Sequence, residues 1–252
     1  MNGAGKKPCG WAQPSDTALK SENPHRRLTR SQTVDKVPQT IFFMEVERQC
    51  KFALMAYEDL NQALTDYYQP RPESPTVSYE DVIQRQSSTA SYEQWLSAMD
   101  SYEQMRKAAK DRLWCSVQAF LVAAGNISKL LWPSYRKGEE LIPERGPELR
   151  VSLAVEEDSP LAPRTLRNHF EHFDVRLEQW AVSSKPRVFV DSNIGPVSMI
   201  SDFKPGDRLR HFDPTTFTVY FREDTYHLRP IIEAIQAIHP RAVAKAKERA
   251  WG

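Results

Sequence analysis

Three residues in the second half of the chain combine the chemistry of proton transfer with that of phosphate binding. Arg167 and Asn168 are adjacent, and His172 follows Arg167 by five positions. A histidine exchanges protons near neutral pH, and an arginine presents a rigid fork of N–H donors that matches phosphate oxygens. These groups suffice to cleave RNA without a metal, because the ribose 2′-hydroxyl must lose a proton and the charge growing on the phosphate must be stabilised.

The pattern Arg167-Asn168-(three residues)-His172 resembles the signature of the HEPN superfamily, helical proteins that include many metal-independent RNA-cleaving toxins. The resemblance implies that His172 acts as base or acid, that Arg167 binds the phosphate and that Asn168 orients His172 or the substrate. Cleavage would leave a 2′,3′-cyclic phosphate and a 5′-hydroxyl, and DNA would be spared because it lacks the attacking hydroxyl. Further predicted contacts with the substrate are Arg164, His169 and Arg176.

The resemblance also implies a bundle over roughly residues 39 to 182 and a role as a toxin or defence effector, with an antitoxin protein as a possible partner. Asp174 stands two residues after His172, where the members paired with nucleotidyltransferase antitoxins often carry a tyrosine. Regulation through that tyrosine is therefore not expected.

The motif lies on a predicted amphipathic helix from about Pro163 to Val182. Its apolar residues recur every three or four positions, which places them in one sector of a helix and predicts a core-facing stripe. The stripe consists of Leu166, Phe170, Phe173, Leu177 and Trp180. Arg167 and His172 lie roughly 140° apart around the helix, so one helix does not direct both at a single phosphate. The resemblance implies that two motif helices meet at a symmetric dimer interface, and the apolar Val175 on the polar side is compatible with such a contact, so we predict a homodimer through this helix.

Two other interpretations stay open. The charged residues Arg164, Glu171, Asp174 and Arg176 can form an ordinary exposed network, and the protein is then a non-catalytic bundle that binds a protein or nucleic acid. A metal interpretation rests on His169 and His172, one turn apart, with help from His211 and Asp213. The usual zinc spacings are absent and the glycines are isolated, so we predict neither a metal nor a cofactor.

Composition sets the broad class. The chain has 252 residues, 40% of them hydrophobic, and a net charge of +1, which predicts one helical domain with appendages and excludes neither nucleic acid nor protein partners. No apolar run approaches the roughly 20 residues of a membrane span. The N-terminal residues do not resemble a secretory signal, and the three cysteines do not indicate a disulfide framework. We therefore expect a cytoplasmic protein.

Helical periodicity covers most of the chain after residue 38. We predict a first helix from Pro38 to about Tyr68, a Ser/Thr/Pro-rich loop to about 88, and a second helix from Ser91 to Leu131 that ends at Trp132-Pro133. Residues 113–124 are apolar nearly all round, which predicts burial on several sides. A short helix is predicted over residues 148–156, and a last one from about Pro230 that breaks near Pro240.

Alternation replaces the helical period after residue 185. Residues 187–190 and 217–221 are predicted strands, residues 197–200 a weaker one, and residues 191–196 a turn. The fold class is thus mainly α: a HEPN-like bundle of about four helices, a small antiparallel sheet or hairpin and a C-terminal helix. The expected division is a disordered tail over 1–38, the bundle over 39–185 and a β-rich extension over 186–252, which packs on the bundle.

Overall fold

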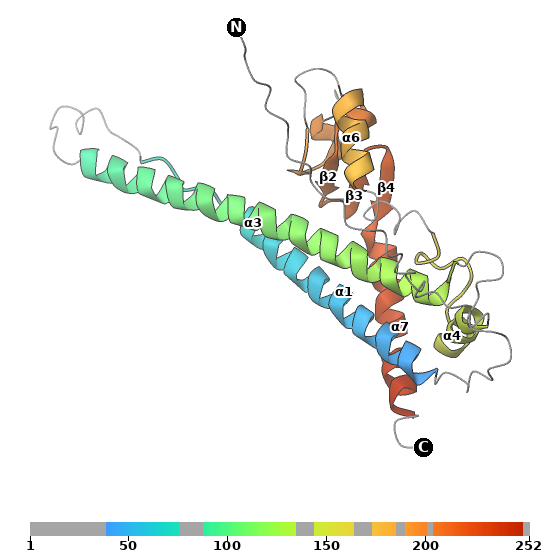
Figure 1. The fold of residues 1–252 in the computed structure, drawn as a ribbon. Coiled ribbons are helices and arrows are strands. Elements are labelled where there is room, and N and C mark those ends of the chain that lie inside the picture. Colours follow the sequence, from blue (N-terminus) through green and yellow to red (C-terminus); the bar gives the residue numbers. More distant parts are fainter. Residues whose placement is uncertain are drawn as a thin grey trace, which may run out of the picture. The chain divides into compact units, whose positions relative to one another are not determined.

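Five helices dominate the part of the chain that the computed structural model describes, which comprises residues 39–75, 88–134, 144–163, 173–184, 190–200 and 204–248 (Figure 1). For residues 88–90, 173 and 205 only the backbone is described. The helices are α1 (Thr40–Tyr67), α3 (Ser88–Leu131), α4 (Arg145–Leu153), α6 (Phe173–Ser183) and α7 (Leu228–Glu248). All belong to one unit that spans Pro38–Gly252.

Helix α1 is the central helix, because it packs against both α3 and α7. Its buried face recurs at helical spacing and is built largely from small side chains. The buried residues are Phe43, Val46, Cys50, Ala53, Ala56, Leu60 and Ala63. The separation of two helices depends on the side chains between them, so alanines bring neighbouring backbones close. Burial raises the pKa of the Cys50 thiol to about 12, with a smaller contribution from Glu47, so this side chain packs as a small neutral group.

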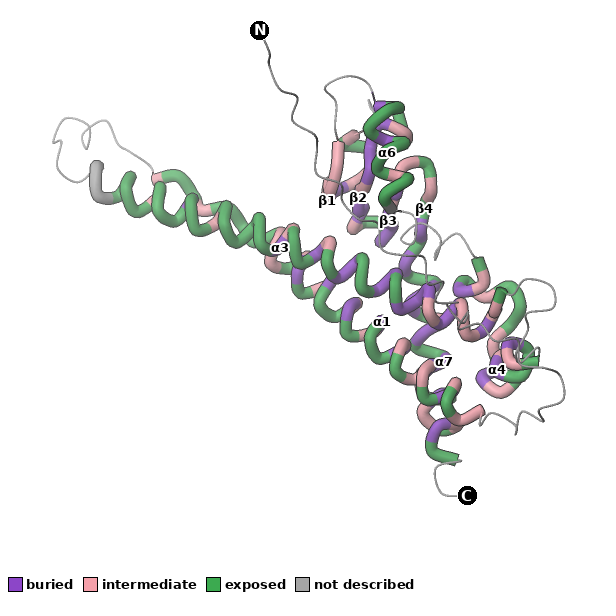
Figure 2. Tube along the Cα trace, in the orientation of Figure 1, coloured by how far each residue is buried: buried purple, intermediate pink, exposed green. Residues whose placement is uncertain are grey.

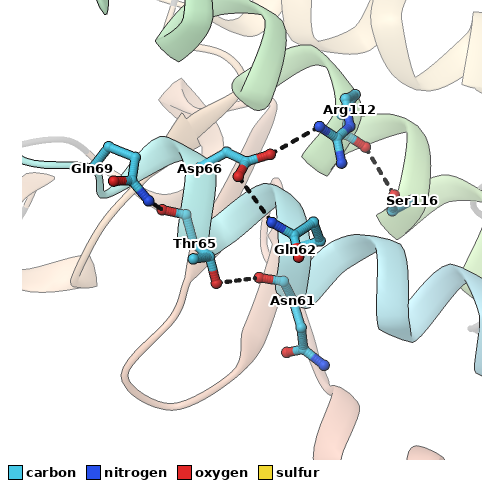
Figure 3. Close-up of polar contacts among 7 residues, drawn as sticks. All are labelled: Asn61, Gln62, Thr65, Asp66, Gln69, Arg112 and Ser116. Carbon is cyan, nitrogen blue, oxygen red and sulfur yellow. Dashed lines mark hydrogen bonds and ion pairs between the residues drawn. The ribbon is translucent and has the colours of Figure 1, made fainter.

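Polar contacts show that α1 and α3 run antiparallel. Asn126 of α3 donates to Gln49 near the start of α1 at 3.2 Å, whereas Arg112 donates to Asp66 near the end of α1 at 2.9 Å. Gln62 also donates to Asp66 at 2.9 Å, so this carboxylate joins both helices (Figure 3). Because Arg112 is largely exposed, the ion pair fixes the alignment of the helices more than it stabilises the fold.

Helix α7 continues through Pro240, so the predicted break at this residue is wrong. Proline removes one backbone hydrogen bond, but Ala242 and Ala246 beyond it are buried and keep the helix packed. Arg241 donates from Nη1 to the carbonyls of Leu153 and Ala154 at 2.9 and 3.0 Å, where α4 ends. The segment after Pro240 is therefore anchored to the end of α4.

The sheet has four strands in the order β1 (Asn193–Ile194), β2 (Arg210–Asp213), β3 (Thr218–Phe221) and β4 (Asp224–His227). Strand β3 confirms the prediction for residues 217–221. The prediction of an antiparallel sheet is wrong at one edge, since β1 pairs with β2 in parallel. Residues 197–200 form a 3-10 helix, η1, and not a strand. The predicted strand at 187–190 lies outside the described residues except for Val190, which bridges to Arg208.

Phe217 joins the sheet to the helices. Its ring makes edge contacts with Tyr57 of α1, at 5.8 Å between centroids, and with Phe212 of β2, at 5.4 Å. The backbone has a φ of 53°, which is unfavourable for a bulky residue. The Leu228 amide donates to the Phe217 carbonyl at 3.0 Å, so α7 begins directly against this turn.

The predicted helices α1 and α3 are confirmed to within three residues at each end, and α4 is confirmed as a short helix over residues 145–153. Helix α3 ends before Trp132-Pro133 as expected. Residues 113–124 are less buried than their apolar sequence predicts, because Cys115, Ala119 and Val122 are exposed. The mainly helical class with a small sheet and a C-terminal helix is confirmed, whereas a HEPN-like bundle stays a prediction. Within the described residues, no helix has the length and apolar content to cross a bilayer.

Replacing a small residue of the α1 seam by a large one should push the helices apart. We expect Ala53→Leu to lower the free energy of unfolding by about 1–3 kcal/mol, because Ala53 is fully buried. The same exchange at exposed Ala119 of α3 should change it by no more than about 0.5 kcal/mol. Urea unfolding followed by circular dichroism measures both, and equal effects would contradict a tight seam.

Candidate functional site

Five of the six predicted site residues lie outside the described part of the chain. They are the catalytic candidates Arg167, Asn168 and His172 and the predicted substrate contacts Arg164 and His169. Arg176 is the one predicted site residue with described contacts, and its Nη1 lies 3.7 Å from the carboxylate of Asp224 in β4. Both side chains are about one-third exposed. Arg176 thus ties α6 to the sheet, and its role in binding a substrate stays a prediction.

The described part of the motif helix packs on the sheet region. Trp180 of α6 is buried, and its indole N–H donates to the Asp207 carbonyl in the short helix η2 (Pro205–Asp207) at 3.0 Å. Leu177, however, is 40% exposed. The predicted core-facing stripe is therefore confirmed at Trp180 and wrong at Leu177. Leu166, Phe170 and the Phe173 side chain lie outside the described residues.

The opposite side of α6 carries uncovered apolar groups. Val175 and Val182 are seven residues apart, which places them on one face, and Val182 is 88% exposed. Arg222 of the β3–β4 turn donates to Gln179 at 3.3 Å and to Ser183 at 3.1 Å. An open depression of about 500 Å³ lies here, and its lining residues are Glu178, Gln179, Val182, Ser183 and Arg222. The partner expected to cover Val175 stays a prediction.

A second group of ionisable side chains lies within the sheet. His211 of β2 is 1% exposed, its ring lies 5.8 Å from that of Tyr220, and the guanidinium of Arg208 lies 4.6 Å from the Tyr220 ring. Burial lowers the pKa of His211 and Arg208 adds to this, whereas the Gly195 carbonyl and Asp213 oppose it. Neither ring nitrogen of His211 has a well-formed hydrogen bond. A neutral imidazole without access to solvent is suited to packing and not to proton exchange with a substrate.

Asp213 has a structural role, which argues against the metal interpretation. Its carboxylate accepts hydrogen bonds from the amides of Val197, Thr215 and Thr216 at 3.1, 2.9 and 3.4 Å, and from the Thr215 hydroxyl. Burial acts to raise the pKa of Asp213, but these hydrogen bonds outweigh it and the net shift is downward. No group of three or more potential metal ligands occurs in the described part of the chain.

The largest apolar feature that sequence reasoning missed is on the outer face of α1. Ile41, Met44, Phe52 and Met55 are all between 48% and 60% exposed. At 100° per residue they fall in a sector roughly 80° wide, opposite the buried seam. Buried and exposed positions alternate along α1 in Figure 2. We call these four residues the α1 outer stripe. Their spacing of three, eight and three residues is the signal in the sequence that places them on one face.

Comparisons with known proteins leave the family open. No family model, no curated protein and no solved structure matches this chain.

The buried state of His211 makes stability depend on pH. In the unfolded chain a histidine takes up a proton below about pH 6.5, while native His211 resists it, so the unfolded state binds more protons and stability falls as the pH drops. We expect the free energy of unfolding to be lower at about pH 5.5 than at about pH 7.5. His211→Phe should remove part of this difference, as measured by urea unfolding at both pH values. An unchanged pH dependence in the variant would contradict a buried neutral imidazole.

Proposed function

We propose that this protein is a helical interaction scaffold and that the α1 outer stripe is the surface on which a helix of a partner protein docks. The observation that supports the proposal is the exposure of four large apolar side chains on one helix face. Their uncovered surface is on the order of a few hundred Å², and patches of that size on a single chain are often functional. Isolated exposed apolar residues are common, but four on one face of a helix are not.

The spacing of the stripe fits a helix as the bound element. Residues that recur within one narrow sector over four turns form a straight apolar strip, into which an amphipathic helix lays its own apolar face. Charged side chains border the strip on α1, among them Glu45, Glu47 and Lys51, and one more, Arg48, lies within the strip between Met44 and Phe52. Apolar groups bordered by polar ones are the usual arrangement of a protein–protein interface.

The second candidate function is the metal-independent endoribonuclease that the motif predicts. The exposure of Val175 and Val182 on α6 favours it, because a pairing helix needs an uncovered face beside the motif. In this proposal two copies meet through α6, and Arg167 and His172 of both chains line one groove. RNA is then the substrate, and an antitoxin protein is the expected inhibitor.

A photo-reactive amino acid at residue 52 tests the docking surface. In the organism's own cells we expect a covalent adduct of one defined mass, with the attached protein identified by mass spectrometry, because Phe52 is one of the two inner apolar residues of the stripe. Adding Met55→Asp should abolish the adduct, since a carboxylate there must be desolvated on binding. The same probe at Val151, which is exposed on α4 and is not part of the stripe, should give none. No adduct at residue 52, or equal adducts at both positions, would refute the proposal.

Incubation of the purified protein with RNA in EDTA tests the nuclease. We expect cleavage that leaves a 2′,3′-cyclic phosphate, a loss of at least about a hundredfold in rate for His172→Ala, and no cleavage of DNA of the same sequence. His227→Ala is the matched control, because His227 lies at the end of β4 and contacts Thr218 at 3.1 Å. Cleavage that survives His172→Ala in a folded variant, or no cleavage by the wild type, would exclude this mechanism.

A further inference from the structure

We propose that the helix that docks on the α1 outer stripe is α1 of a second copy of this chain, antiparallel to the first and related to it by a twofold axis at Arg48. This inference rests on the proposed function, because it names the partner of the same surface. Three features of the stripe support it: the symmetry of its apolar spacing, the order of its charges and its size.

The apolar spacing is symmetric about Arg48. Ile41 and Met55 each lie seven residues from Arg48, and Met44 and Phe52 each lie four residues from it. A twofold axis perpendicular to the helix at this residue places Ile41 level with the partner's Met55, and Met44 level with the partner's Phe52. An isologous interface requires such a self-complementary pattern, whereas a surface for an unrelated helix does not.

The charges along one edge of the stripe are also self-complementary. Glu47 and Lys51 lie on the same edge and contact each other within the helix at 2.6 Å. In the antiparallel pair the partner's Lys51 comes within about two residues of the level of Glu47, or about 3 Å along the axis. Each Lys51 therefore has a carboxylate from both chains within reach. Arg48 lies on the axis and faces its own copy, and Glu45, 3.0 Å away in the same chain, offsets that repulsion.

The size of the stripe predicts a weak dimer. Four half-exposed side chains and their charged rim offer less than the roughly 800 Å² per chain of a standard interface. Exposed ion pairs add little affinity but select the partner and its direction. Self-association is therefore expected only at high protein concentration, and electrostatics should decide which chains pair.

A charge exchange in the full-length protein tests the pairing. Glu47→Lys makes this edge wholly basic and Lys51→Glu makes it wholly acidic, so each variant alone should sediment with the single-chain mass of 29.0 kDa under conditions where the wild type shows twice that mass. An equimolar mixture of the two variants should restore the doubled mass, because opposite edges then meet. Circular dichroism of each variant establishes that α1 is still folded.

A cysteine on the proposed axis tests the geometry independently of affinity. In a Cys9→Ser, Cys115→Ser background, Arg48→Cys should form a disulfide-linked dimer under mild oxidation, since a residue on the axis meets its own copy. Val151→Cys, at an exposed site on α4, should remain largely unlinked.

Each outcome decides the inference. A wild type with the single-chain mass at several hundred micromolar, a mixture no heavier than its components, or equal linking at residues 48 and 151 would overturn it. If the probe at residue 52 then attaches to a different protein, the docking surface stands and the second copy is excluded. If no adduct forms at all, both proposals fail. A dimer that resists the charge variants but is lost in Val182→Asp lies on α6, which also overturns the inference.

Discussion

The close packing of α1 against its neighbours is the constraint on which the rest of the structure depends. Cys50, Ala53, Ala56 and Ala63 supply almost no side-chain bulk, so two helices can approach the same central helix. Alanine is also the best helix former, so the seam costs no helical propensity. Helix α1 therefore packs against α3 and α7 at once.

That arrangement accounts for the position of the α1 outer stripe. A helix with neighbours on two sides buries about half of its circumference, and in this helix small residues occupy four of the seven buried positions, beside Phe43, Val46 and Leu60. Phe52 and Met55 fall at helical positions outside that half, so they lie on the uncovered face. The outer face of α1 therefore carries large apolar side chains in addition to those of its buried face.

The sequence predicted the long helices well because their signals are local. The helical period of α1 and α3, Pro38 before α1 and Pro133 after α3 are properties of short windows, and they predict bounds close to those observed. Tertiary contacts decided the features that were missed. Pro240 does not break α7 because Ala242, Ala246 and Arg241 hold the following turns against their neighbours. The parallel edge strand β1 has two residues, too few for any period to be read. Leu177 is 40% exposed although it shares a helix face with buried Trp180, and a helical wheel does not show how much of that face the neighbouring elements cover.

Local sequence patterns say least about the geometry of the candidate site. The motif names residue types and a spacing, but convergence of Arg167 and His172 on one phosphate depends on a second helix, and a sequence of one chain does not contain that arrangement.

The two uncovered apolar faces, one on α1 and one on α6, would each pair with a different surface. If both paired by a twofold axis, each chain would have two isologous interfaces, and the assembly would either close into a tetramer with intersecting axes or grow as an open filament. A dimer is therefore compatible with only one of the two faces, and the mass of the assembly distinguishes a protein built around α1 from one built around its motif helix.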